Sequence, residues 1–79
     1  MRVILDVRTP EEFAEGHVPS AKNIPVHELA HRLHEVGSKE QTVVVYCRSG
    51  GRSAAAATLL KRAGYAAVDD IGPISNWRG

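Results

Sequence analysis

The sequence predicts an α/β fold, a three-layer α/β/α sandwich around a mostly parallel sheet. The first observation is the run Val43–Tyr46, which consists of β-forming residues without polar alternation and indicates a strand buried on both faces. The second is the order of segments, because strand-like and helix-like runs alternate along the 79 residues. We therefore expect a single domain over residues 1–79, with its sites at the carboxyl ends of the strands.

The first strand is expected over Val3–Leu5, and a helix begins soon after it. Thr9 suits the N-cap position, and Pro10 suits the first helical position. Glu12 follows Thr9 by three residues, where it completes a capping box. The helix should end near Gly16, and residues 16–20 should form a loop with Pro19 as a further stop.

The rest of the chain continues the alternation. A short strand is expected over Ala21–Ile24, then a helix over Val26–Val36. After the central strand, another helix should span about Arg52–Ala63, with Gly64 as a left-handed cap, and Tyr65–Asp69 is the expected final strand. The apolar residues of the first of these two helices share one face, which should pack on the sheet: Val26, Leu29, Leu33 and Val36.

Composition excludes several classes of partner. A net charge of +1 with interspersed signs gives no basic field for nucleic acid or an anionic membrane, and no apolar stretch approaches membrane-spanning length. The N-terminus lacks a signal-peptide layout, and a single cysteine can form no internal disulfide. We expect a cytoplasmic monomer, or a periplasmic protein if a signal peptide has been removed, without nucleic-acid or membrane partners.

The only cysteine, Cys47, directly follows the central strand. Gly50 and Gly51 after it allow backbone angles closed to other residues, and the helix-forming run Ala54–Leu60 follows them. A tight loop at a helix N-terminus directs free N–H groups, and the positive end of the helix dipole, at the group that ends the strand. We therefore expect the pKa of Cys47 to be lowered, which would give a thiolate nucleophile without an adjacent base.

Two arginines in this loop favour an anionic sulfur donor. Arg48 and Arg52 can each supply forked hydrogen-bond donors to a sulfonate-like dianion such as thiosulfate. Attack on its outer sulfur would release sulfite and leave a persulfide on Cys47, from which cyanide or a thiol would take the sulfur in a ping-pong reaction. No metal or cofactor is expected. The expected substrate-binding residues are Arg48, Ser49, Gly50, Gly51 and Arg52.

Two segments resemble rhodanese-type sulfurtransferase domains. Val3–Pro25, which reads V-I-L-D-V-R-T-P-E-E-F-A-E-G-H-V-P-S-A-K-N-I-P, is similar to the opening of such domains. Cys47–Ser53, which reads C-R-S-G-G-R-S, resembles their active-site loop. The short single-domain form looks most like phage-shock-type thiosulfate sulfurtransferases. The resemblance implies a rhodanese-like fold and transfer of sulfur from thiosulfate.

The sequence departs from this family pattern at both ends. The usual leading helix and strand are missing, and Gly72-Pro73 stands where the family has a pair of glycines. The sequence ends at Gly79 without a full last helix. We therefore expect a rhodanese-like sandwich trimmed at both ends, with the loop intact.

Two other functions stay open at this point. Cys47 could hold a persulfide for a partner protein, which would make the chain a non-catalytic carrier or binding module. A cysteine phosphatase or arsenate reductase is less favoured, although a cysteine-arginine loop at a helix N-terminus also binds oxyanions. Four residues separate Cys47 from Arg52, one fewer than in phosphatases of the related fold, and the smaller ring suits a sulfur atom better than a phosphate.

We expect structural roles for the other polar residues. Asp6 and Arg8 end a neighbouring strand and could line the same mouth, but we favour a salt bridge or capping pair that holds the turn. His27, His31 and His34 share one face of the helix expected there. Because one straight helix seldom surrounds a metal with three ligands, we expect a solvated face and not a metal site.

Overall fold

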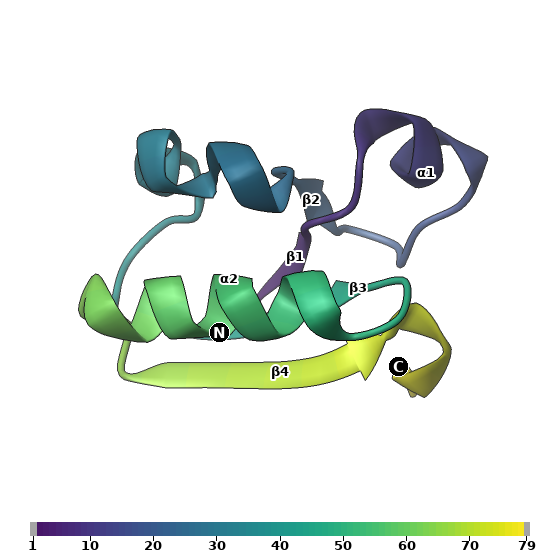
Figure 1. The fold of residues 1–79 in the computed structure, drawn as a ribbon. Coiled ribbons are helices and arrows are strands. Elements are labelled where there is room, and N and C mark those ends of the chain that lie inside the picture. The colour runs from purple at the N-terminus through teal and green to yellow at the C-terminus, as the bar shows by residue number, and fades with distance from the viewer. Residues whose placement is uncertain (1, 79) are drawn as a thin grey trace.

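A four-stranded, fully parallel sheet forms the centre of the computed structural model, which describes residues 2–78. The strand order is β2-β1-β3-β4 (Figure 1). The two central strands pair in register from Arg2 opposite Thr42 to Asp6 opposite Tyr46. Their carboxyl ends therefore meet at one edge of the sheet. The strands are β1 (Arg2–Asp6), β2 (Lys22–Asn23), β3 (Thr42–Cys47) and β4 (Ala67–Pro73).

Helices of two kinds join the strands or follow the last one. The first α-helix has the predicted capping box at Thr9 and Glu12, with Pro10 at its start. Within residues 2–78, no helix combines the length and apolar character needed to cross a membrane. The α-helices are α1 (Pro10–Glu15) and α2 (Gly51–Arg62), and the 3₁₀ helices are η1 (Val26–His31), η2 (Leu33–Glu35) and η3 (Ile74–Asn76).

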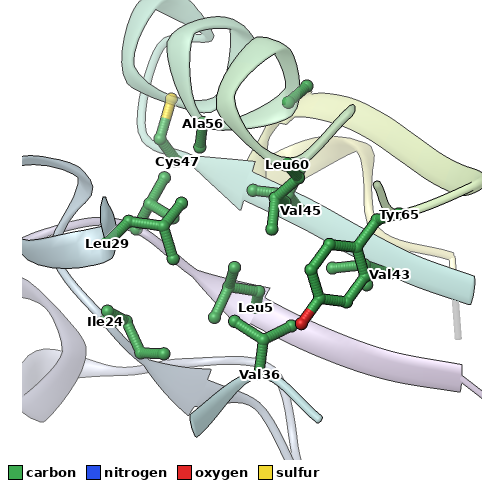
Figure 2. Close-up of a cluster of buried hydrophobic side chains, with 12 residues drawn as sticks. Leu5, Ile24, Leu29, Val36, Val43, Val45, Cys47, Ala56, Leu60 and Tyr65 are labelled. Carbon is green, nitrogen blue, oxygen red and sulfur yellow. The ribbon is translucent and has the colours of Figure 1, made fainter. Parts of the chain in front are cut away.

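The two faces of the sheet carry different layers. Because successive side chains of a strand alternate, Leu5, Val43 and Val45 point to one face, where they form the core with residues of α2 and the first two 3₁₀ helices (Figure 2). Val44 and Tyr46 point to the other face, against the segments around Trp77 and Val18. The predicted α/β fold with a parallel sheet between two layers is confirmed, and short segments make up the second layer.

The prediction of one continuous helix over Val26–Val36 is wrong. The segment forms η1 and η2, separated at Arg32, whose backbone angles are φ −127° and ψ 22°. Its hydrogen bonds span three residues, as from the N–H of Arg32 to the carbonyl of Leu29 at 3.0 Å. A 3₁₀ helix rises about 2.0 Å per residue, more than an α-helix, so it returns the chain across the sheet in fewer residues. The apolar face still packs as expected, because Leu29 and Val36 are fully buried.

The final strand begins later and extends further than predicted. The expected range was Tyr65–Asp69, whereas β4 spans Ala67–Pro73. Tyr65 lies in the turn that caps the C-terminal end of α2: its N–H donates a hydrogen bond to the carbonyl of Leu60 at 3.1 Å, after Gly64 with φ 104°. The strand then continues through Gly72-Pro73, which pairs with the end of β3 across an irregularity in the register. This pairing places Pro73 beside Cys47.

Candidate active site

Cys47 ends β3 and has a fully buried side chain. The backbone N–H of Gly50 donates a hydrogen bond to its Sγ at 2.9 Å. The hydroxyl oxygen of Ser53, itself fully buried, lies 3.5 Å from the same sulfur. Figure 2 shows Cys47 at the edge of the core, beside α2. The cysteine therefore occupies a pocket of hydrogen-bond donors between the end of a strand and the start of a helix.

Gly50 gives the loop its shape. This residue is the N-cap of α2 and adopts φ 109° and ψ −25°, the left-handed region that favours glycine. Its carbonyl accepts a hydrogen bond from the Ser53 hydroxyl at 3.1 Å and another from the N–H of Ala54 at 3.1 Å. A Cβ atom on Gly50 would meet Pro73 only at 3.8 Å, so backbone conformation and not space requires glycine here.

The environment of Cys47 favours its anionic form. Burial alone raises the pKa of the Cys47 thiol, but the Ser53 hydroxyl and the backbone N–H groups of Ser53, Gly50 and Ser49 outweigh it, so the pKa is lowered. In the neutral form the thiol donates to Ser53 Oγ, and this hydroxyl donates to the Gly50 carbonyl. After ionisation, rotation of the hydroxyl suffices to direct its proton at the sulfur. Ser53 thus links the charge state of Cys47 to the loop.

Ser53 is a site residue that the sequence analysis missed. The expected set ends at Arg52, because it rests on the two arginines and on the backbone amides of the residues between them. A signal was present: Ser53 is the third residue of the helix that follows the cysteine loop, on the same turn as its N-terminus. A hydroxyl at that position can turn back toward the group that the helix start faces.

The two loop arginines have different surroundings. Both terminal nitrogens of Arg52 donate to the Glu12 carboxylate, at 2.7 and 3.0 Å. Arg48 is exposed and makes no hydrogen bond or ion pair with the rest of residues 2–78. Ser49 and Gly51 are also exposed. Of the expected substrate-binding residues, the structure thus places Gly50 and the Ser49 amide near the sulfur, leaves Arg48 free, and directs the guanidinium of Arg52 to α1.

Asp6 and Arg8 form the salt bridge that we favoured from the sequence. Arg8 Nη2 lies 2.8 Å from Asp6 Oδ2, and its Nε lies 3.0 Å from Oδ1. The Tyr46 hydroxyl donates to Asp6 Oδ2 at 2.7 Å and accepts from the N–H of Val18 at 3.1 Å. Burial is the main cause that raises the pKa of Tyr46 to about 12, so the phenol stays protonated as this donor. Arg8 also donates to the Gly16 carbonyl at 2.7 Å, which fixes the loop after α1.

A surface hollow of about 410 Å³ lies beside the cysteine loop. Arg48 is the loop residue that lines it, and Arg8 brings a second arginine to its wall. Cys47 is fully buried and does not line the hollow, so the loop separates the sulfur from this space. Its lining residues are Arg8, Glu12, Glu15, Gly16, Arg48 and Ile74.

The histidines of η1 and η2 do not line this hollow. The side chains of His27 and His34 are 75% and 78% exposed, and His31 is exposed as well, as expected for a solvated face. Among the described residues, no three His, Cys, Asp or Glu side chains gather in a way that could hold a metal ion. His17, on the loop after α1, stacks on Phe13 with ring centroids 3.6 Å apart.

Comparison with known proteins gives consistent relatives. The family model described as Rhodanese-like domain matches residues 1–78. A protein of Allochromatium vinosum named sulfurtransferase is 41% identical over 76 residues, which cover 95% of this chain and 70% of the relative. Thiosulfate sulfurtransferase PspE of Escherichia coli is 38% identical over 73 residues, covering 91% of this chain and 70% of that protein. The solved structure described as rhodanese with anions from E. coli superposes with a TM-score of 0.90 at 36% identity, covering 98% and 92% of the two chains.

Proposed function

The chain belongs to the rhodanese-like domain family, and on this premise we propose that it is a thiosulfate sulfurtransferase that works through a persulfide on Cys47. One observation supports this most: Cys47 is the sole cysteine and accepts a hydrogen bond from Gly50 at the start of α2, with Ser53 close by. These groups lower the pKa of the Cys47 thiol and so favour a thiolate nucleophile without a histidine or carboxylate base.

The proposed reaction has two half-reactions. The Cys47 thiolate attacks the outer sulfur of thiosulfate, the S–S bond of the donor breaks, and sulfite leaves with the bonding electron pair. Cys47 then carries a persulfide. A thiolate or cyanide acceptor attacks the terminal sulfur of that persulfide, the new S–S bond breaks, and the Cys47 thiolate is regenerated. Each half-reaction exchanges one sulfur atom, so the kinetics are ping-pong.

The residues around Cys47 have distinct proposed roles. The amides of Ser49 and Gly50 and the hydroxyl of Ser53 stabilise negative charge on the sulfur. Arg48, free at the mouth of the hollow, is placed to attract the sulfonate end of the donor. The similar E. coli rhodanese was solved with anions, which supports an anionic donor here as well. Gly51 and Arg52 complete the loop, while the buried pair of Asp6 and Arg8 holds the turn after β1.

Access to the sulfur requires local movement. Because Cys47 has no exposed surface, the atoms that cover Sγ must move before the outer sulfur of a donor can reach it. This restricts attack to small donors and to acceptors with a narrow reacting end. The proposed substrates are therefore a small sulfur donor, thiosulfate, and cyanide or a thiol as acceptor.

The test is sulfur transfer by the whole chain and by Cys47→Ser. With thiosulfate and cyanide, the native protein should form thiocyanate and the variant should form none. Mass spectrometry after thiosulfate treatment should show a gain of one sulfur atom on Cys47. Thiocyanate formation by Cys47→Ser would contradict the proposal, and so would hydrolysis of an aryl phosphate at a comparable rate. Persulfide formation without catalytic turnover would identify a carrier instead.

A further inference from the structure

Arg52 is bound by a carboxylate from another element. Its Nη1 donates to Glu12 Oε1 at 2.7 Å and its Nη2 donates to Oε2 at 3.0 Å, a forked pair across 40 residues of sequence. The side chains are 34% and 20% exposed, so the pair is partly shielded from water. Glu12 Oε1 also accepts from the N–H of Thr9 at 3.0 Å and from its hydroxyl at 3.2 Å. The carboxylate is therefore shared between the start of α1 and the cysteine loop.

This pair joins the first turns of two helices. Glu12 stands in the first turn of α1, and Arg52 stands in the first turn of α2. That turn of α2 also contributes the groups nearest Cys47, the N–H of Gly50 at its N-cap and the hydroxyl of Ser53. Movement of Arg52 would therefore move the donors that surround the sulfur.

The hollow beside the loop also distinguishes Arg48 from Arg52. Glu12 and Arg48 line it, and Arg52 does not. An anion entering the hollow would meet the free guanidinium of Arg48 before that of Arg52, whose forked donors are already on Glu12. The guanidinium of Arg52 also brings the pKa of Glu12 down to about 2, so the pair stays ionised on both sides at neutral pH.

We propose that Glu12 is a positioning residue of the persulfide site: it holds Arg52 against α1, and the pair fixes the first turn of α2 around Cys47 without contacting the sulfur donor. The inference rests on the proposed sulfurtransferase function and refines it. It assigns Arg52, which the sequence predicts to bind substrate, a role that acts through the loop. Recognition of the anionic end of thiosulfate then falls to Arg48.

Two variants separate positioning from substrate binding. Glu12→Gln removes the charge but keeps a side chain that serves in a capping box, so α1 retains its start. Arg52→Gln removes the other partner. If the pair positions the loop, both variants should lower kcat for thiosulfate and cyanide by about tenfold, with KM for thiosulfate within about twofold of native. The double variant should be no worse than the poorer single variant, because the two residues act as one unit.

A second measurement needs no sulfur transfer. Alkylation of Cys47 by iodoacetamide at fixed pH reports how well the loop stabilises the thiolate. Both variants should slow it, since both loosen the donors. If charge alone mattered, the two variants would change the alkylation rate in opposite directions. Glu12→Gln would free a cation near the thiolate and speed alkylation, whereas Arg52→Gln would slow it.

Matched controls are available on the same two helices. Glu11→Gln changes an exposed carboxylate in the first turn of α1, and Arg62→Gln changes an exposed arginine in the last turn of α2, so both should behave as native. A higher KM for Arg52→Gln together with a lower KM for Glu12→Gln would overturn the proposal and make Arg52 the ligand of the donor. Variants indistinguishable from the controls would overturn it as well. If the native protein transfers no sulfur, the proposed function fails, and the alkylation rates still decide the positioning role.

Discussion

Two buried polar clusters lie at the carboxyl edge of the sheet, and they differ in how their hydrogen bonds are completed. The charge cluster consists of Asp6, Arg8 and Tyr46, and the thiol cluster of Cys47, Gly50 and Ser53. In the charge cluster a carboxylate meets a guanidinium and a phenol, so the charges are balanced within it. In the thiol cluster, amide and hydroxyl groups surround a sulfur that has no cationic partner in direct contact among residues 2–78.

This difference in hydrogen bonding suits the charge cluster to stabilising the fold and the thiol cluster to reacting. A buried ion pair with all its hydrogen bonds made has little tendency to react, and removal of one partner leaves an uncompensated charge. A ring of neutral donors stabilises an anion without cancelling its charge, so the thiolate keeps its nucleophilicity. In the described residues no buried side-chain nitrogen or oxygen lacks a partner, so neither cluster has an unmet polar group. We infer that the charge cluster holds the edge of the sheet and the thiol cluster performs the chemistry.

The largest expected effect comes from opening the charge cluster. Asp6→Asn leaves the buried guanidinium of Arg8 without its counter-charge and should lower the free energy of unfolding by about 3–5 kcal/mol. For a domain of this size that approaches its whole stability. Urea unfolding would measure the loss, with Glu11→Gln as an exposed control. A loss below about 1 kcal/mol would show that the pair adds little and would remove this half of the comparison.

A substitution that disrupts the thiol cluster should lower activity more than stability. Gly50→Val places a β-branched residue at φ 109°, so the loop must change conformation and withdraw the N–H from Cys47. We expect kcat for sulfur transfer to fall by about a hundredfold or more, as when one donor to a developing charge is removed. Gly51→Val is the matched control, because Gly51 is not in the left-handed region and a Cβ there meets nothing within 4 Å. Equal activity in the two variants would show that the Gly50 amide is not needed.

The sequence predicts the layers of this fold better than its helix types. Alternation of segments, the capping box at Thr9 and the buried run Val43–Tyr46 all depend on neighbouring residues, and the structure confirms each. The 3₁₀ form of Val26–His31 depends on the distance that the chain must cover across the sheet, which no local pattern encodes. The extension of β4 through Pro73 likewise depends on pairing with β3.

The site shows the same limit. The position of Cys47, the left-handed glycine and the helix that follows could be predicted, because they are contiguous. The salt bridge between Asp6 and Arg8 could also be predicted, because the two residues stand two positions apart in the sequence. The partner of Arg52 lies on another helix, so the sequence alone leaves this arginine available to substrate, and its bond to Glu12 becomes visible only in the fold. The roles of Arg48 and Ser49 in binding a donor stay predictions.

A smaller change sharpens the account of the thiol cluster. Ser53→Ala removes the hydroxyl that opposes the effect of burial on Cys47, so the pKa of the thiol should rise. The rate of alkylation by iodoacetamide, measured against pH, should reach its midpoint at a higher pH than in the native protein. Ser49→Ala is the control, because that side chain is exposed and its contribution comes from the backbone. A midpoint that stays in place would leave the backbone amides alone to explain the acidity of Cys47.

The smallest effect concerns the ion pair that connects α1 to the thiol cluster. The Arg52 guanidinium, and next the N–H of Thr9, lower the pKa of Glu12 from 4.5 to about 2. A pKa lowered in the folded state adds stability above the unfolded value, and this contribution disappears as the pH falls from 4.5 toward 2. Because the pair is partly exposed, the contribution should be about 1 kcal/mol or less. Urea unfolding of the native protein and Glu12→Gln at about pH 6 and about pH 3 would measure it.

The difference in unfolding free energy between the native protein and Glu12→Gln isolates the contribution of Glu12. This comparison is needed because Arg32 also lowers the pKa of Glu35, so Glu35 makes the stability depend on pH in the same direction. At the higher pH the native protein should have the larger free energy of unfolding. Its difference from Glu12→Gln should become smaller at the lower pH. Arg52→Gln should show the same narrowing, since it removes the same pair. A gap that widens in acid would mean that Glu12 is more easily protonated in the fold than in the unfolded chain. The carboxylate could then not hold Arg52, and the thiol cluster would depend on its own loop alone.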